Sequence, residues 1–150
     1  VCSSDLGGIM EPNLEFINPY DQDQPNNELY EVIENETISN CNLKGLTISG
    51  ALFSLSHFKN VTFVSCVFFA TKLENTTFEN CRFVDCKFQF TSTSHCEFES
   101  TQFANCIWDS SPIHKTKFSD CFMDAKTVHY VKKESQSNPV ANNMIKKIAA

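Results

Sequence analysis

An apolar residue at almost every fifth position is the feature that most constrains the fold of this chain. Counted in fives from Ile33 to Val128, nineteen of twenty positions are apolar, whereas a chain that is 41% hydrophobic would place about eight there by chance. A period of five matches neither a helix nor a strand. Such a stripe stays on one side only if the chain turns by about 90° every five residues. We therefore predict a coil that closes after four repeats, about 20 residues.

The apolar positions of this register are predicted to fill the core, and ten of the 14 Phe occupy them. Thr93 is the one polar residue in the series. We interpret it as an underpacked spot, with a bulge beside a ligand as the alternative. The predicted structural core consists of Phe53, Phe58, Phe63, Phe68, Leu73, Phe78, Phe83, Phe88, Phe98, Phe103, Trp108 and Phe118.

The position two residues before each apolar one is small. Between Cys41 and Cys121 it holds seven of the eight Cys, and only Leu46 is large. All 15 charged residues between Ile38 and Ala125 avoid both positions. Burial explains this exclusion, because an unpaired charge in a protein core is very costly. We predict that large and small residues alternate inside the coil.

This pattern, seen clearly in Thr76–Phe88, resembles the motif of the pentapeptide-repeat family, which places Leu or Phe at its centre and a small residue two positions earlier. The resemblance implies the family fold, an all-β right-handed quadrilateral β-helix. Glu36 and Lys126 would place charges in the small position, so the predicted solenoid spans residues 38–125. That length corresponds to about 4.5 coils.

The flanking segments are predicted to cover the two ends of the solenoid. Residues 1–37 form an N-terminal arm and cap, in which residues 1–9 are interpreted as a non-native extension. Residues 126–150 form a partly helical C-terminal tail. Its short helix is expected after Pro139, beyond a joint at Ser135–Asn138, from apolar residues spaced by four: Val140, Met144 and Ile148. The alternative is a frayed tail that stays disordered. In some family members a C-terminal helix or strand mediates dimerisation, so the resemblance allows a homodimer through residues 126–150.

The eight cysteines first suggest a disulfide framework or a zinc site. The register argues against both, because Cys66, Cys86 and Cys106 lie 20 residues apart and stack on one side of successive coils. We interpret them as small core residues and predict no metal site. Buried free thiols favour a reducing compartment, so we expect the protein in the cytoplasm. No run of 18 apolar residues is present, so no membrane span is expected.

Catalytic motifs are not found. The four His show no metal-binding spacing, and the chain has no glycine-rich phosphate loop, no paired catalytic carboxylates and no Ser/His/Asp arrangement. We predict that the protein is not an enzyme, that it has no catalytic residues and that it needs no cofactor.

One outward side of the predicted coil is apolar, and we interpret it as the surface for a protein partner or for self-association. The alternatives are that the flanks fold back over it or that it is scattered surface hydrophobicity. The predicted partner-binding residues, called the apolar patch below, are Val64, Val67, Phe69, Ala70, Val84, Phe90 and Ile107.

A second hypothesis comes from the family resemblance. Some members protect bacterial type II topoisomerases from quinolones, by an accepted similarity in shape to B-form DNA. Mimicry requires a strongly negative surface. The net charge of −6 lies mainly in residues 1–37, which hold nine acids and no Lys or Arg, whereas residues 38–125 carry eight acids and seven bases. The body is therefore nearly neutral, and we predict a bacterial binding or scaffold module that does not bind nucleic acid directly.

Asparagine is frequent at the fifth position of the repeat. Asn40, Asn60 and Asn80 lie 20 residues apart and predict an external ladder of amides at one corner. Glycosylation sequons begin at Asn35, Asn60 and Asn75. With the Phe-rich repeat, they resemble the luminal domain of a synaptic vesicle glycoprotein, so an extracellular module is a minor alternative. A secreted bacterial effector is another.

Overall fold

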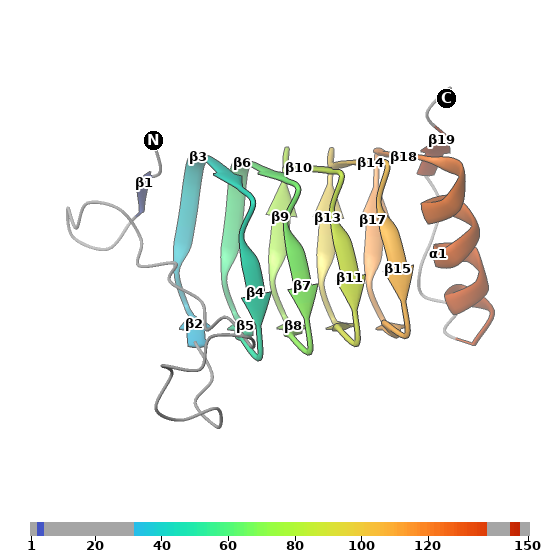
Figure 1. Cartoon of the computed structure of the whole chain (residues 1–150), viewed down its shortest axis with the longest axis horizontal. Coiled ribbons are helices and arrows are strands. Elements are labelled where there is room, and N and C mark those ends of the chain that lie inside the picture. Colours follow the sequence, from blue (N-terminus) through green and yellow to red (C-terminus); the bar gives the residue numbers. More distant parts are fainter. Residues whose placement is uncertain (1–2, 5–31, 138–144, 148–150) are drawn as a thin grey trace.

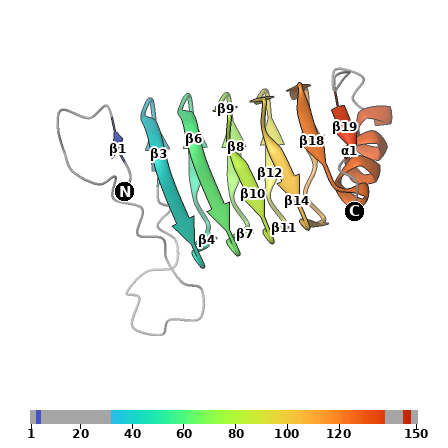
Figure 2. The same ribbon diagram turned by 90° about the horizontal axis from the view of Figure 1, so that it is seen from above.

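The computed structural model describes residues 3–4, 32–137 and 145–147. Short parallel strands wind into a four-sided β-solenoid of about five turns, with a helix at its C-terminal end (Figure 1). This confirms the predicted right-handed quadrilateral β-helix. The coils follow one another in chain order along a straight axis (Figure 2).

The strands of the solenoid have the following bounds: β2 (Val32–Glu34), β3 (Thr37–Lys44), β4 (Thr47–Ser49), β5 (Leu52–Ser54), β6 (His57–Val64), β7 (Val67–Phe69), β8 (Lys72–Glu74), β9 (Thr77–Glu79), β10 (Arg82–Val84), β11 (Lys87–Gln89), β12 (Ser92–Ser94), β13 (Glu97–Glu99), β14 (Gln102–Ala104), β15 (Ile107–Asp109), β16 (Ile113–His114), β17 (Lys117–Ser119) and β18 (Cys121–Met123). Outside them lie β1 (Ser3–Ser4), α1 (Ala125–Ser137) and β19 (Ile145–Lys147). Strand β1 pairs antiparallel with β3.

Each strand of the solenoid pairs in parallel with the strand 20 residues away, as when Phe83 lies between Phe63 and Phe103. This register produces four faces, named here after the strands of one coil. The β9 face also contains β13, β17 and the first halves of the long strands β3 and β6. The β10 face also contains β14, β18 and the second halves of β3 and β6. The β11 face contains β4, β7 and β15, and the β12 face contains β2, β5, β8 and β16.

The corners between faces are made by a left-handed residue at every fifth position. From Asn35 to Asp120 each of these residues has a φ between 46° and 66°. Asn, Asp and Gly adopt this conformation most readily, and they occupy more than half of the corners. The corner repeat turns the chain, so the five-residue period follows directly from backbone geometry.

The core consists of aromatic columns parallel to the solenoid axis. Phe63 stacks on Phe83 at 4.7 Å with an interplanar angle of 2°, and Phe83 stacks on Phe103 at 5.0 Å. Eleven of the twelve predicted core residues are at most 2% exposed. Trp108 is half-buried instead, because its strand β15 is the end strand of its sheet. In place of a further aromatic ring in the column, Trp108 packs on Tyr130 of α1, with ring centroids 5.5 Å apart. Its Nε1 donates to Thr127 Oγ1 at 3.1 Å.

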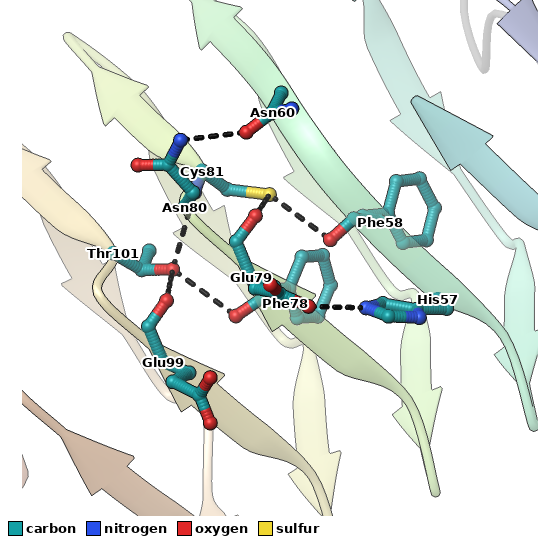
Figure 3. Close-up of polar contacts among 9 residues, drawn as sticks. All are labelled: His57, Phe58, Asn60, Phe78, Glu79, Asn80, Cys81, Glu99 and Thr101. Carbon is teal, nitrogen blue, oxygen red and sulfur yellow. Dashed lines mark hydrogen bonds and ion pairs between the residues drawn. The ribbon is translucent and has the colours of Figure 1, made fainter. Parts of the chain in front are cut away.

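The small inward position carries a hydrogen-bond donor as well as a small side chain. Cys81 Sγ lies 3.4 Å from the carbonyl oxygens of both Phe58 and Glu79 (Figure 3). Thr101 Oγ1 makes the equivalent contacts one coil later, to Phe78 O at 3.1 Å and to Glu99 O at 3.0 Å. Glu99 O also accepts from Asn80 N at 2.8 Å, so the side chain adds a second donor to a carbonyl that already has a backbone partner. Cys, Thr and Ser therefore suit this position better than Ala, because their buried donors find acceptors and add hydrogen bonds between coils.

The solenoid begins earlier than the predicted limit of Ile38. Strand β2 pairs in parallel with β5, and Ile33 is buried opposite Phe53. Glu36 occupies a small position but remains half-buried, and its backbone N–H donates to Ser56 Oγ at 3.3 Å. Exclusion of charge describes the fully enclosed coils and does not hold at Glu36, near the start of the solenoid.

The C-terminal helix is present, but its predicted position was wrong. Helix α1 starts at Ala125, directly after β18, and includes Ser135–Ser137, which were predicted to be a joint. Asp124 caps it, because Thr127 N donates to Asp124 Oδ1 at 2.7 Å. Residues 138–144 lie outside the described residues, and Ile145–Lys147 form β19, which pairs with β18.

Helix α1 covers the C-terminal end of the solenoid and supplies partners to its last coil. Val131 is buried against the core. Tyr130 Oη accepts from Ser111 N at 2.9 Å and donates to Ser111 O at 2.8 Å. Glu134 Oε1 accepts from Ile113 N at 3.2 Å. Helix α1 thus covers the edges of β15 and β16, which could otherwise pair with another molecule.

Thr93 occupies an aromatic position without distorting the strand. Strand β12 keeps its regular pairing with β8 and β16, so no bulge is present there. Thr93 is 1% exposed, and among the described residues its Oγ1 is a buried side-chain polar atom without a hydrogen-bond partner. Because a buried unpaired hydroxyl is unfavourable, this position is suboptimal for stability.

We predict that Thr93→Val stabilises the fold by about 1 kcal/mol, because Val has the same shape without the unpaired hydroxyl. The matched control is Thr91→Val, two residues away. Thr91 Oγ1 donates to Phe68 O at 3.0 Å, so loss of this hydrogen bond in Thr91→Val should destabilise the fold by about 1–2 kcal/mol. Urea unfolding monitored by circular dichroism measures both. Equal destabilisation by the two substitutions would contradict the conclusion that the Thr93 hydroxyl has no hydrogen-bond partner.

Candidate interaction surface

The apolar patch of the sequence analysis is only partly contiguous. Phe69 and Phe90 pack edge to face, with ring centroids 5.6 Å apart and planes at 84°. Ala70 N donates to Gln89 O, which places Ala70 on the coil adjacent to Phe90 and at the same corner. Phe69, Ala70 and Phe90 therefore form one group, called the Phe90 corner below.

Other members of the apolar patch are separated from this corner. Val64 and Val84 are register neighbours on the β10 face. Val67 and Ile107 belong to one column of the β11 face, but Lys87 lies between them. The predicted seven-residue patch is thus divided by a cation, since the sequence analysis grouped residues by side and did not follow each column.

Phe90 has an unusual combination of exposure and backbone conformation. Its side chain is 56% exposed, and its φ is 51° in the left-handed region. That conformation costs an ordinary residue about 1–2 kcal/mol and is unusual for a bulky one. Neither burial nor backbone preference explains a Phe at this corner, which makes it a candidate for contact with a partner.

A second exposed apolar group was missed by the sequence analysis. Val32 and Leu52 are register neighbours on the β12 face, and Val32 is 50% exposed. Leu55 occupies the following corner with a φ of 51° and is 54% exposed. The sequence signal was available: Leu55 and Phe90 are the two large apolar residues at corner positions where Asn and Gly are favoured.

The cysteines in the small positions are mainly free buried thiols. Cys66, Cys81, Cys86, Cys96, Cys106 and Cys121 are free, whereas Cys41 is disulfide-bonded, contrary to the interpretation of the whole series as core filler. In the described part of the chain, no group of three or more His, Cys, Asp or Glu could hold a metal ion.

Burial makes most of these thiols hard to ionise. It raises the pKa of Cys81 and Cys106 to about 12, and that of Cys96 and Cys121 to about 11. The hydrogen bond between the Cys66 and Cys86 side chains raises the pKa of Cys86. The same hydrogen bond lowers the pKa of Cys66 to about 7. These pKa shifts do not identify a cellular compartment, so the cytoplasmic location stays a prediction. No described helix is long and apolar enough to cross a membrane.

The comparisons with known proteins identify no family for this chain. No protein-family model matches the chain, and no curated protein matches it. Among solved structures, it is similar to QnrB1, described as a plasmid-mediated fluoroquinolone resistance protein. The two share 10% sequence identity with a TM-score of 0.21, over 82% of this chain and 86% of QnrB1. A score this low supports no functional argument, so the fold assignment rests on the strand register.

We predict that Cys81→Thr makes the protein more resistant to alkaline pH. Thr should be accepted, because Thr101 occupies the next position of the same column with equivalent hydrogen bonds. The folded pKa of Cys81, about 12, exceeds the value of about 8.5 for an unfolded thiol. The thiol therefore favours folding fully below about pH 8.5, and this contribution is lost as the pH rises toward 12.

Urea unfolding of wild type and Cys81→Thr between pH 7 and pH 10 measures this effect. The two should differ little at pH 7, and by pH 10 wild type should have lost about 2 kcal/mol more than the variant. The control Cys81→Ala removes the hydrogen-bond donor and should already be destabilised at pH 7. If the stabilities of wild type and Cys81→Thr changed with pH in parallel, the conclusion that burial raises the pKa of Cys81 would be contradicted.

Proposed function

We propose that this chain is a non-enzymatic protein-binding module, a rigid pentapeptide-repeat scaffold that presents the Phe90 corner to a protein partner. The observation that carries the proposal is a 56% exposed aromatic side chain held in a left-handed backbone conformation. Aromatic residues are enriched at the centres of protein interfaces, where they are buried on binding.

The surroundings of Phe90 suit such a contact. Its edge-to-face packing on Phe69 restricts the rotation of both rings, so less conformational entropy is lost when a partner covers them. The corner stands on stacked coils whose rings are 4.9 Å apart at Phe68 and Phe88. Lys87 and Gln89 on the same face provide polar groups at the edge of the apolar contact.

The charge distribution favours a protein contact over mimicry of DNA. Every face of the solenoid carries cationic side chains, for example Lys59 on the β9 face, Arg82 on the β10 face, Lys87 on the β11 face and Lys72 on the β12 face. A DNA mimic needs a continuous negative field. A gyrase supercoiling assay with a fluoroquinolone tests that alternative separately, and protection of gyrase would contradict the scaffold proposal.

We predict that Phe90→Asp reduces partner binding or self-association while it preserves or raises stability. Asp adopts the left-handed conformation readily, so the substitution should relieve about 1 kcal/mol of backbone strain. The matched control is Ser100→Asp, which adds the same charge at an exposed corner between other faces.

Light scattering after size-exclusion chromatography gives the oligomeric state, and pull-downs from the native source followed by mass spectrometry give the partners. Thermal unfolding of each variant shows whether it is folded. The proposal predicts that Phe90→Asp loses a contact that wild type and Ser100→Asp retain. An unchanged oligomeric state together with an unchanged set of partners would show that the Phe90 corner is not an interface.

A further inference from the structure

A polar groove lies at the corner between the β9 and β10 faces, diagonally across the coil from the Phe90 corner. It has a volume of about 450 Å³, which is in the range of small-molecule sites. Strands β3 and β6 provide its lining: Thr37, Ser39, Asn40, His57, Lys59 and Asn60. None of these residues belongs to the apolar patch.

The amide ladder at this corner has a direction. Asn80 Nδ2 donates to Asn60 Oδ1 at 2.6 Å (Figure 3), and Asn60 Nδ2 donates to Asn40 Oδ1 at 3.1 Å. Each amide therefore polarises the next in the same sense. The donor end of the ladder is Asn40, in the groove, and among the described residues the Nδ2 of Asn40 donates no hydrogen bond.

A cation lies beside this donor end. Lys59 lines the groove and follows Ser39 in the same column. Glu79 is the next residue of that column, but its Oε1 pairs with His57 Nε2 at 3.2 Å (Figure 3). Within the part of the chain that the structure describes, Lys59 forms no ion pair. Its charge is therefore available to a ligand in the groove.

We propose that this groove binds the oxyanion group, phosphate or carboxylate, of a small molecule. Lys59 supplies the positive charge, and the Asn40 amide and the Thr37 hydroxyl supply neutral donors. Lysine binds phosphate as a point charge, and hydrogen bonds to an ionised acceptor are about twice as strong as neutral ones. The aligned amides add a positive partial charge at Asn40, as the aligned peptides of a helix do at its N-terminus.

The test is a titration of the ¹⁵N-labelled full chain with inorganic phosphate, and separately with acetate, followed by NMR. We expect phosphate or acetate to shift the signals of Asn40 and Asn60 side-chain amides in a saturable manner. Lys59→Gln should weaken binding about tenfold, the effect of losing one charged hydrogen bond. The control is Lys87→Gln, which removes the same charge from the β11 face and should leave the affinity unchanged.

A second variant separates the amide donor from the structure of the ladder. Asn40→Asp keeps an oxygen that accepts from Asn60 Nδ2 but replaces the free donor by a negative charge. It should abolish binding while thermal unfolding stays close to that of wild type. Absence of saturable shifts with both anions would overturn the proposal, as would equal weakening by Lys59→Gln and Lys87→Gln. The Phe90 proposal does not depend on any of these outcomes.

Discussion

The stacking of each coil on the next, at a spacing of 20 residues, is the constraint on which the rest of the structure depends. It places like residues above one another, so a column is stabilised or destabilised as a whole. Phe78 and Phe98 stack at 4.8 Å in one such column. Cys86 and Cys106 belong to another column, in which each thiol repeats one contact: it lies 3.3 Å from the carbonyl oxygen 23 residues earlier. The aromatic columns remove apolar area from water, and the thiol and hydroxyl columns add hydrogen bonds to backbone carbonyl oxygens of their own coil and of the preceding one.

Much of this arrangement could be predicted from the sequence, because a period of five with charge excluded from two positions leaves few alternatives. The ends could not be predicted in the same way. Val128 continues the five-residue register in the sequence, yet it belongs to helix α1. The helix begins after Asp124 because this residue caps its N-terminus. Glu36 breaks the charge rule because it is not fully enclosed. The hydrogen-bonding role of the cysteines was missed as well, since spacing alone does not reveal donor and acceptor geometry.

The corners are where this fold can vary without disturbing its core. The inward positions are set by stacking and the strands by their register, whereas a corner side chain points outward and needs only a left-handed backbone. Asn80 uses that freedom for a ladder, and Phe90 uses it to expose an aromatic ring. The sequence analysis found the Phe-rich side but missed Leu55, although its place at a corner position could be read from the five-residue period. It also missed the groove around Lys59, because a groove depends on which side chains are neighbours across coils. The five-residue period is therefore enough to predict the fold, whereas the candidate sites also require the neighbours of each residue in the coils on either side.

The most direct test of this account is the insertion of one extra coil. Duplication of residues 81–100 directly after Ser100 adds four complete repeats and keeps every column in register. A matched insertion that duplicates only residues 83–100 shifts all later columns by two residues. Urea unfolding followed by circular dichroism should show a cooperative transition for the full coil, at a midpoint no lower than that of wild type, and a lowered or lost transition for the shorter insertion. Equal behaviour of the two insertions would contradict stacking in register as the basis of the fold.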